Sequence, residues 1–249
     1  LRLSQKCTFA AKCLFLPTKS YEQSLEKKFL LVYNKYMCDT KEILATLAKD
    51  FPNAKSELNF NNPFELLVAV ILSAQCTDKR VNKVTPSLFA VADTPQKMAD
   101  MPVEQIEELI HSCGFYHSKA KYLHEMSSDI VARFGGQVPS DIESLRSLSG
   151  VGRKTANVVY AVGFGGQAIA VDTHVFRVSN RLGIADATNV LDTEKQLMAA
   201  IPPEEGADSH HYILLHGRYV CKAQHPLCEQ CSVRNLCKYY RTHNKVDNQ

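Results

Sequence analysis

The stretch LSGVGRKTANVV, residues 148–159, decides the fold, because two glycines, Gly150 and Gly152, stand directly before a helix-favouring run. It looks like a nucleotide-binding phosphate loop, but that loop needs a glycine directly before its lysine. Arg153 holds that place here. Upstream, residues 140–143 form a capping-box pattern led by a serine, which opens a short helix rather than a strand. The stretch therefore predicts two helices joined by a tight glycine turn, and it excludes the nucleotide site.

Helix signals continue on both sides of this turn. Asn62 is a natural cap, and Pro63 opens a helix whose apolar residues recur at helical spacing. A second apolar pattern from Val103 is stopped by Gly114. Ser118 is expected to cap a third helix that ends at the glycine pair 135–136.

The C-terminal half follows the same pattern. Asp172 is a natural N-cap for a helix that runs to about Leu182, with Gly183 directly after its end. Further helices are expected near residues 192–200 and 207–220. Because strand signals are nearly missing, the sequence predicts an all-α protein.

Composition sets the broad class. The chain has 249 residues, 45% of them hydrophobic, a formal net charge of +3 and a pI near 8.3. Such a chain is long enough for a buried core, and its mild positive charge permits an anionic partner without demanding one. No run of about 18 apolar residues is present, so the sequence predicts a globular protein without a membrane span.

The first 36 residues carry no clear helix or strand signals, and the chain does not begin with methionine. Met37 is a plausible true start, so we expect residues 1–36 to be a non-native or disordered extension. A targeting peptide is the alternative, because four basic residues precede the first acidic one, Glu22.

The glycine turn and the lysine after it point to two kinds of chemistry. Backbone N–H groups at a helix N-terminus can hold a DNA phosphate, although Gly150 and Gly152 also suit a plain turn between helices. Lys154 lies in the first turn of the second helix, where the helix dipole disfavours its positive charge. Such a lysine is either a nucleophile, which must lose its proton to react, or a solvated phosphate contact.

Asp172 follows an apolar run 18 residues after Lys154. Its simplest role is that of a helix cap. If it faces Lys154 across a cleft, its carboxylate could instead stabilise positive charge on a sugar while a glycosidic bond breaks.

Four of the nine cysteines crowd into residues 221–237, with the spacing C-x6-C-x2-C-x5-C. Four thiolates so close together are enough for one closed metal site in a reducing compartment. The spacing suits tetrahedral zinc as well as an iron–sulfur cluster. The four ligands would be Cys221, Cys228, Cys231 and Cys237.

Several stretches together resemble the endonuclease III family of helix-hairpin-helix DNA glycosylases and abasic-site lyases. They are LSGVGRKTANVV, AVDTHVFRV, LHGRYVC, LLVAVILSAQCTDKRVN and GFYHSKA, together with the cysteine spacing. The resemblance covers about residues 37–240. It implies an all-α protein in which a six-helix barrel, residues 56–166, and an iron–sulfur domain, residues 37–55 and 167–240, flank a DNA cleft.

The resemblance also implies roles for single residues. Lys154 matches the catalytic nucleophile and Asp172 the catalytic carboxylate, while the four clustered cysteines match the ligands of a 4Fe-4S cluster. DNA contacts are expected from Gln75, Phe115, Gly150, Gly152, Arg153, His174 and Lys222. Gln75 and Phe115 match residues that enter the duplex. Judged from the sequence pattern without this resemblance, Gln75 is expected to be an ordinary polar residue at a helix end, and Phe115 a core residue.

The sequence departs from the family pattern in a few places. Ser149 stands where proline is usual, which should alter the rigidity of the glycine turn. Phe115 stands where leucine is common, which should alter the shape of the wedge, meaning the pair Gln75 and Phe115 that enters the duplex. The loop CKAQHPLC carries little positive charge besides Lys222, which should weaken phosphate contact.

The implied activity is removal of oxidised pyrimidines from duplex DNA, followed by strand cleavage through β-elimination, in base excision repair. The expected partner is double-stranded DNA with damaged pyrimidines or abasic sites. We expect the protein to act as a monomer and to have no membrane partner. The expected compartment is the bacterial cytoplasm with its nucleoid, or a eukaryotic nucleus or mitochondrion. The alternatives are a monofunctional adenine glycosylase, which lacks the lysine, and a non-catalytic DNA-binding module with a structural metal.

Overall fold

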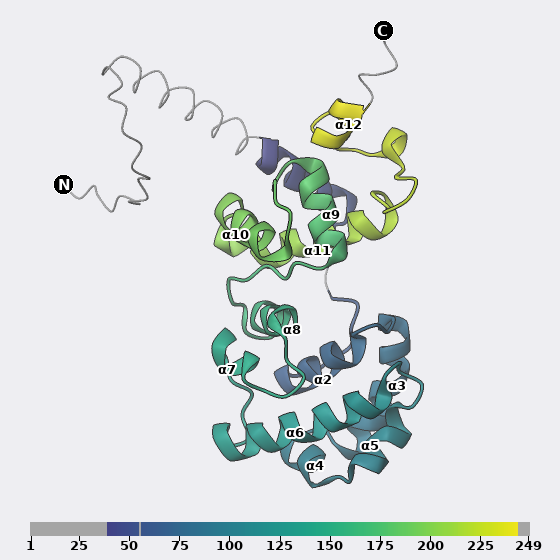
Figure 1. The fold of residues 1–249 in the computed structure, drawn as a ribbon, viewed down its shortest axis with the longest axis vertical. Helices are drawn as coiled ribbons and strands as arrows, with labels where there is room; N and C mark the ends of the chain where they lie inside the picture. The colour runs from purple at the N-terminus through teal and green to yellow at the C-terminus, as the bar shows by residue number, and fades with distance from the viewer. Residues whose placement is uncertain (1–38, 55, 244–249) are drawn as a thin grey trace, which may run out of the picture. The chain divides into compact units, whose positions relative to one another are not determined.

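The computed structural model describes residues 39–54 and 56–243, and every regular element in these ranges is a helix (Figure 1). The all-α prediction is confirmed. None of the helices in this part of the chain is long and apolar enough to cross a membrane. The extension expected over residues 1–36 lies outside the described residues.

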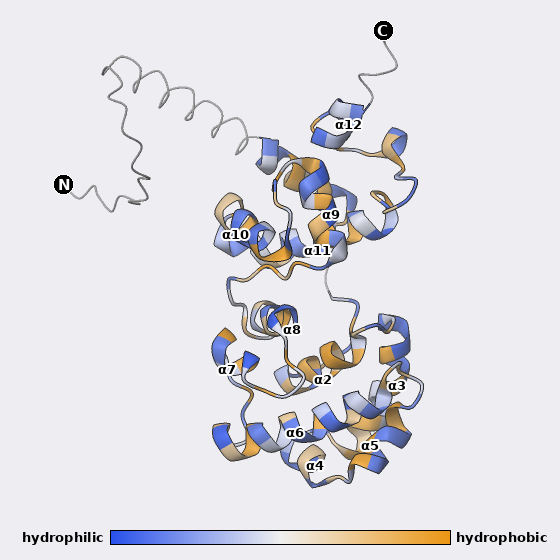
Figure 2. Ribbon diagram, in the orientation of Figure 1, coloured by the Kyte–Doolittle hydropathy of each residue, from blue (hydrophilic) through white to orange (hydrophobic). Residues whose placement is uncertain are grey.

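The first group of helices surrounds one hydrophobic cluster. Its members are α2 (Pro63–Ser73), α3 (Asp78–Val91), α4 (Pro95–Asp100), α5 (Val103–Ile110), α6 (Tyr116–Phe134), α7 (Ile142–Arg146) and α8 (Arg153–Val158), which continues as the π-helical segment Val159–Gly163. Helix α2 is apolar along almost its whole length (Figure 2), as expected of a helix that is covered on every side.

The second group has its own hydrophobic cluster, built from both ends of the described chain. A helix over residues 39–50 packs there with helices from the C-terminal half, so Ile43 and Leu47 meet Val175 and Ile213. Those helices are α9 (Thr173–Leu182), α10 (Val190–Ala200), α11 (Gly206–Tyr219) and α12 (Lys238–His243). The described residues nevertheless fall within one compact unit, so the expected division into two domains stays a prediction.

Most of the expected helix ends are confirmed. The Asn62 side chain accepts a hydrogen bond from the Glu65 backbone N–H at 2.9 Å, which caps α2. Helix α6 ends at Gly135 and α9 at Gly183, and both glycines have the positive φ that this position favours. The helices expected near residues 192–200 and 207–220 are α10 and α11.

Two expected caps are wrong. Helix α7 is capped by Asp141 rather than Ser140, because the Asp141 carboxylate accepts from the Ser144 backbone N–H at 2.8 Å. Helix α6 begins at Tyr116, ahead of the expected cap at Ser118. Tyr116 packs against the first hydrophobic cluster, so the first turn of α6 is anchored by packing and has no side-chain cap.

The glycine turn between α7 and α8 packs closely against α6. Gly150 has φ +73°, and a Cβ atom added there would lie 2.7 Å from the Cβ of Tyr122. Ser149, which replaces the usual proline, donates a hydrogen bond to Glu125 Oε2 at 2.6 Å. Gly152 has φ −81°, and its added Cβ would meet nothing within 4 Å in the described structure.

The two glycines should therefore tolerate substitution very differently. We expect Gly150→Ala to lower the free energy of unfolding by about 2–4 kcal/mol, because it adds left-handed strain and a steric clash. Gly152→Ala is the matched control and should lose only the weaker N-cap preference, about 0.5–1 kcal/mol. Urea unfolding followed by circular dichroism measures both, and equal losses would contradict the packing described here.

Candidate active site

Lys154 and Asp172 lie in contact. The Lys154 Nζ atom is 3.7 Å from Asp172 Oδ2, with side chains 55% and 14% exposed. Lys154 reaches this point from the first turn of α8, directly after the glycine turn, and Asp172 from the residue before α9. The two elements thus bring a solvent-accessible amine to a mostly buried carboxylate.

The two oxygens of Asp172 have separate partners. Oδ1 accepts hydrogen bonds from the backbone N–H groups of His174 and Val175, both at 2.8 Å, and so caps α9. Oδ2 faces Lys154. Helix capping and contact with the lysine are therefore compatible roles for one carboxylate, because the cap needs only one oxygen and fixes the direction of the other.

A cavity opens beside this pair. Lys154, Val158 and Asp172 line it on one side. Its other lining residues come from distant segments: Ser56, Glu57, Leu58, Val70, Ser73, Asp78, His210, His211, Leu214, Leu215 and Arg218. The amine and the carboxylate therefore share a recess that is open to a ligand.

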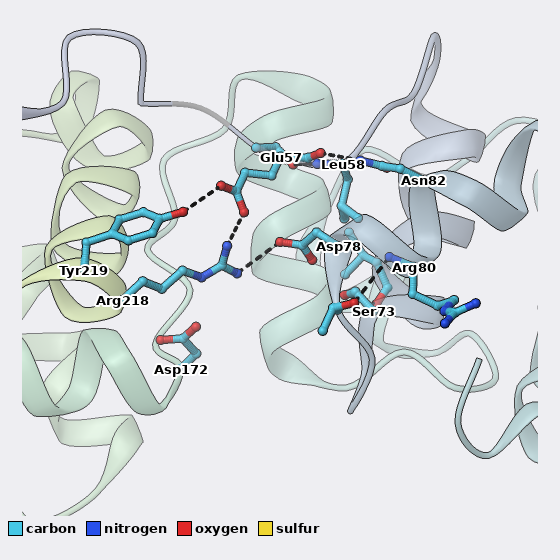
Figure 3. A network of polar contacts seen from close by, with 12 residues as sticks. Glu57, Leu58, Ser73, Asp78, Arg80, Asn82, Asp172, Arg218 and Tyr219 are labelled. Atoms are coloured by element: carbon cyan, nitrogen blue, oxygen red, sulfur yellow. Dashed lines mark hydrogen bonds and ion pairs between the residues drawn. The ribbon is translucent and has the colours of Figure 1, made fainter. Parts of the chain in front are cut away.

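An ion-pair network forms part of the cavity wall (Figure 3). Arg218 of α11 pairs with Glu57 and, through Nη2 at 3.0 Å, with Asp78 Oδ2. The Tyr219 hydroxyl donates to Glu57 Oε1 at 3.4 Å. The sequence analysis did not predict this network, because its members come from three segments with no local pattern in common.

His210 is a second residue that the sequence analysis missed. Its side chain is 8% exposed and lines the cavity, and its Nδ1 atom has no hydrogen-bond partner in the described structure. Burial lowers the pKa of His210 from 6.5 to about 4, and the neighbouring His211 acts in the same direction. A neutral imidazole therefore stands beside the lysine and the carboxylate at physiological pH.

The two residues expected to enter the duplex occupy neighbouring loops. Gln75 has φ +52° and Phe115 φ +58°, conformations that cost free energy for residues with a side chain. Phe115 is 68% exposed, so the reading of it as a core residue is wrong. A Cβ atom added to Gly114 would lie 3.5 Å from the Gln75 carbonyl oxygen, which places the two loops in contact.

Three further residues expected at DNA have partners within the protein. Arg153 makes two hydrogen bonds to Glu194 of α10, at 2.9 and 2.8 Å. His174 Nδ1 lies 3.2 Å from Arg177 Nη2. The Lys222 side chain is exposed, while its carbonyl accepts from Arg181 at 2.7 Å. Their DNA contacts stay predictions.

The four clustered cysteines surround a second cavity, with an empty volume of about 330 Å³. All four thiols are free, and Leu182, Val220 and Leu227 are among the apolar residues around them. Burial raises the pKa of Cys231 to about 11. The thiolate form that iron binds therefore needs the positive charge of a metal centre.

The arrangement of these thiols suits both metals left open by the sequence. Zinc in a structural site takes four ligands around one centre, and an iron–sulfur cluster is also held by four thiolates. The choice between them depends on the comparison with known families.

The cysteine segment is tied directly to α9. Arg177 donates to the Cys221 carbonyl at 3.1 Å, and Arg181 donates to the carbonyls of Lys222 and Ala223 at 2.7 and 3.1 Å. The Cys237 thiol donates to the Arg181 carbonyl at 3.3 Å. Helix α9, which Asp172 caps, therefore binds the cysteine segment through residues nearer its C-terminal end.

A helix-hairpin-helix, a lysine beside a capping carboxylate and a four-cysteine cluster site together define a DNA glycosylase of the base-excision type. The family model for HhH-GPD superfamily base excision DNA repair proteins matches residues 68–203. The model for the iron–sulfur binding domain of endonuclease III matches residues 221–237.

Full-length relatives agree with the family models. Endonuclease III of Haemophilus influenzae is 46% identical over 198 residues, which cover 80% of this chain and 94% of the relative. Endonuclease III of Bacillus subtilis is 50% identical over 189 residues, covering 76% and 86%. The solved structure of a trapped covalent intermediate of endonuclease III with DNA matches with TM-score 0.78 and 47% identity, covering 83% of this chain and 97% of that one.

This chain belongs to the endonuclease III family. It is a bifunctional DNA glycosylase and abasic-site lyase of base excision repair, with a 4Fe-4S cluster domain, as the resemblance predicted. The individual catalytic, DNA-binding and ligand residues stay predictions.

Burial of His210 should make the protein sensitive to acid. Because its folded-state pKa lies below 6.5, the unfolded chain takes up the proton first as pH falls, and stability is lost from pH 6.5 down to about 4. We expect this group to remove about 2 kcal/mol between pH 7 and pH 5. His210→Gln should flatten that part of a stability profile measured by urea unfolding; an unchanged slope would contradict the assignment.

Proposed function

We propose that Lys154 and Asp172 carry out the glycosylase and lyase reactions on double-stranded DNA that contains an oxidised pyrimidine or an abasic site. One observation carries the proposal: Lys154 Nζ lies 3.7 Å from Asp172 Oδ2 at a shared cavity. The family match supports the reaction type, and the trapped DNA intermediate of a relative supports an enzyme nucleophile.

In the binding step, the damaged nucleotide leaves the base stack and enters the cavity beside Lys154. Extrusion costs a few kcal/mol, and less for a lesion that stacks or pairs poorly. We propose that Gln75 and Phe115 fill the gap left in the duplex, which their exposed, neighbouring loops support. Backbone N–H groups of the turn at Gly150 and Gly152 then hold a phosphate.

In the chemical step, the Lys154 ammonium first gives a proton to Asp172 Oδ2. The neutral amine forms a bond to C1′ of the deoxyribose, and the glycosidic C–N bond breaks with its electron pair leaving on the base. The proton on Asp172 passes to the departing base, so the carboxylate is negatively charged again and stabilises the cationic sugar. The new secondary ammonium then gives a proton, through Asp172, to O4′ as the C1′–O4′ bond breaks and the Schiff base forms. Loss of a C2′ proton makes a C2′–C3′ double bond and expels the 3′ phosphate.

Two alternatives from the sequence are less well supported. A monofunctional adenine glycosylase lacks the lysine, whereas Lys154 contacts the carboxylate here. A non-catalytic DNA-binding module has no need of an amine and a carboxylate at one cavity. We further propose that the enzyme acts in the bacterial cytoplasm, since the relatives compared come from bacteria.

Lys154 should be required for covalent trapping. With borohydride and abasic-site DNA, the wild-type protein should form a stable adduct through the reduced Schiff base, and Lys154→Ala should form none. Gel electrophoresis after denaturation measures the adduct. Lys195→Ala, at an exposed lysine outside the site, is the control for loss of a positive charge and should still be trapped. An adduct that survives Lys154→Ala would defeat the assignment.

Two variants of Asp172 distinguish the effect of its negative charge from its role as the N-cap of α9. Asp172→Asn keeps a side-chain oxygen for the N–H groups of α9 but removes the charge beside Lys154, so base release should slow by about 10²–10³-fold with near-normal stability. Asp172→Ala should lose the same activity and also about 1 kcal/mol of stability. Single-turnover kinetics and urea unfolding measure the two effects. Full activity of Asp172→Asn would show that Asp172 only caps α9 and has no catalytic role.

A further inference from the structure

Two thiols lie directly behind the residues expected to enter the duplex. Cys76 follows Gln75, and Cys113 stands two residues before Phe115. Both thiols are free; Cys76 is half-buried, and Cys113 is 1% exposed. A Cβ atom added to Gly114 would lie 3.5 Å from the Gln75 carbonyl, so the backbones next to the two thiols are in contact.

A buried lysine joins the same two loops. Lys119 of α6 is 4% exposed, and its Nζ atom donates to the Leu72 carbonyl near the end of α2 at 2.9 Å. Burial lowers the pKa of Lys119, while nearby Cys76 and Cys113 oppose this effect. The loop that ends α2 and the loop that begins α6 therefore share a small buried cluster of two thiols and one amine.

Cys76 and Cys113 follow and precede the two residues of this loop contact, and both belong to the first hydrophobic cluster. Burial raises the pKa of Cys113 to about 11, and the charge of nearby Cys76 acts in the same direction. Arg80 and Lys119 act on Cys113 in the opposite direction. The more accessible Cys76 is thus the thiol that a small oxidant reaches first, and Cys113 is its neighbour.

We propose that Cys76 and Cys113 form an oxidation site, at which a peroxide converts the two thiols into a disulfide that ties the Gln75 loop to the Phe115 loop. Nothing in the glycosylase or lyase chemistry uses these thiols. The consequence for DNA binding rests on the proposed function, because it requires Gln75 and Phe115 to contact DNA.

The reaction balances with hydrogen peroxide as the oxidant. The Cys76 sulfur attacks one peroxide oxygen, the O–O bond breaks, and the leaving hydroxide takes a proton to become water. The Cys113 sulfur then displaces the oxygen from the Cys76 sulfenic acid, which leaves as a second water. The two thiols lose two electrons in total, and these reduce one peroxide to two waters.

A disulfide would change the shape of the proposed wedge. Its S–S bond is about 2.05 Å long, far shorter than a hydrogen-bond contact between two sulfur atoms. Closing that gap pulls on residues next to Gln75 and Phe115, which already hold the costly left-handed conformation. We therefore expect the oxidised protein to present the two side chains less well to a duplex.

Trypsin places the two thiols in separate peptides. Cleavage after lysine yields residues 56–79 and 98–119, and each peptide contains one cysteine. The cluster-loaded protein is treated with hydrogen peroxide, blocked with N-ethylmaleimide and digested without reduction, while visible absorption checks that the cluster survives. Mass spectrometry should find the two peptides joined, with Cys76→Ser as the negative control. Two peptides that remain separate, or Cys76 found only as sulfinic acid, would overturn the proposal.

The effect on DNA is measured on the same samples. Oxidised wild-type protein should bind abasic-site duplex about tenfold more weakly, equal to about 1.4 kcal/mol, with recovery after dithiothreitol. Cys76→Ser should bind normally before and after peroxide. If the disulfide forms and Phe115→Ala weakens binding, but oxidation does not, the regulatory inference fails. If neither Phe115→Ala nor Gln75→Ala weakens binding, the proposed wedge fails instead, while the oxidation site itself stands.

Discussion

The arrangement of this protein depends on the hydrogen bonds that one carboxylate oxygen makes with the start of α9. Asp172 Oδ1 accepts from two backbone N–H groups, at 2.8 Å each, so the side chain has little freedom to turn. The other oxygen is thereby held 3.7 Å from Lys154. A local capping interaction, common at helix starts, thus sets the geometry of the reactive pair.

The same helix connects the reactive pair to the cluster segment. Arg177 and Arg181 lie one and two turns further along α9 and donate to the carbonyls of residues 221–223. The cysteine segment and the N-cap carboxylate are therefore held by the same helix, at opposite ends.

Two arginines make three ion pairs between the segments around one hydrophobic cluster and those around the other. Arg218 of α11 reaches Glu57 and Asp78, and Arg153 of α8 reaches Glu194. The pairs of Arg218 lie on the wall of the cavity beside Lys154. Partly buried pairs of this kind add little net stability, but breaking one leaves a charge without its partner.

The sequence by itself determined the helices, most of their caps and the cysteine spacing, because these depend on residues within a few positions of each other. Its errors were also local, as at Ser118, where packing of Tyr116 outweighed the polar signal. Only the tertiary structure decided that Asp172 faces Lys154, that Arg218 lines the cavity and that Cys76 lies near Cys113. Each of these contacts joins segments far apart in the chain, and no periodic pattern records which distant segments pack together.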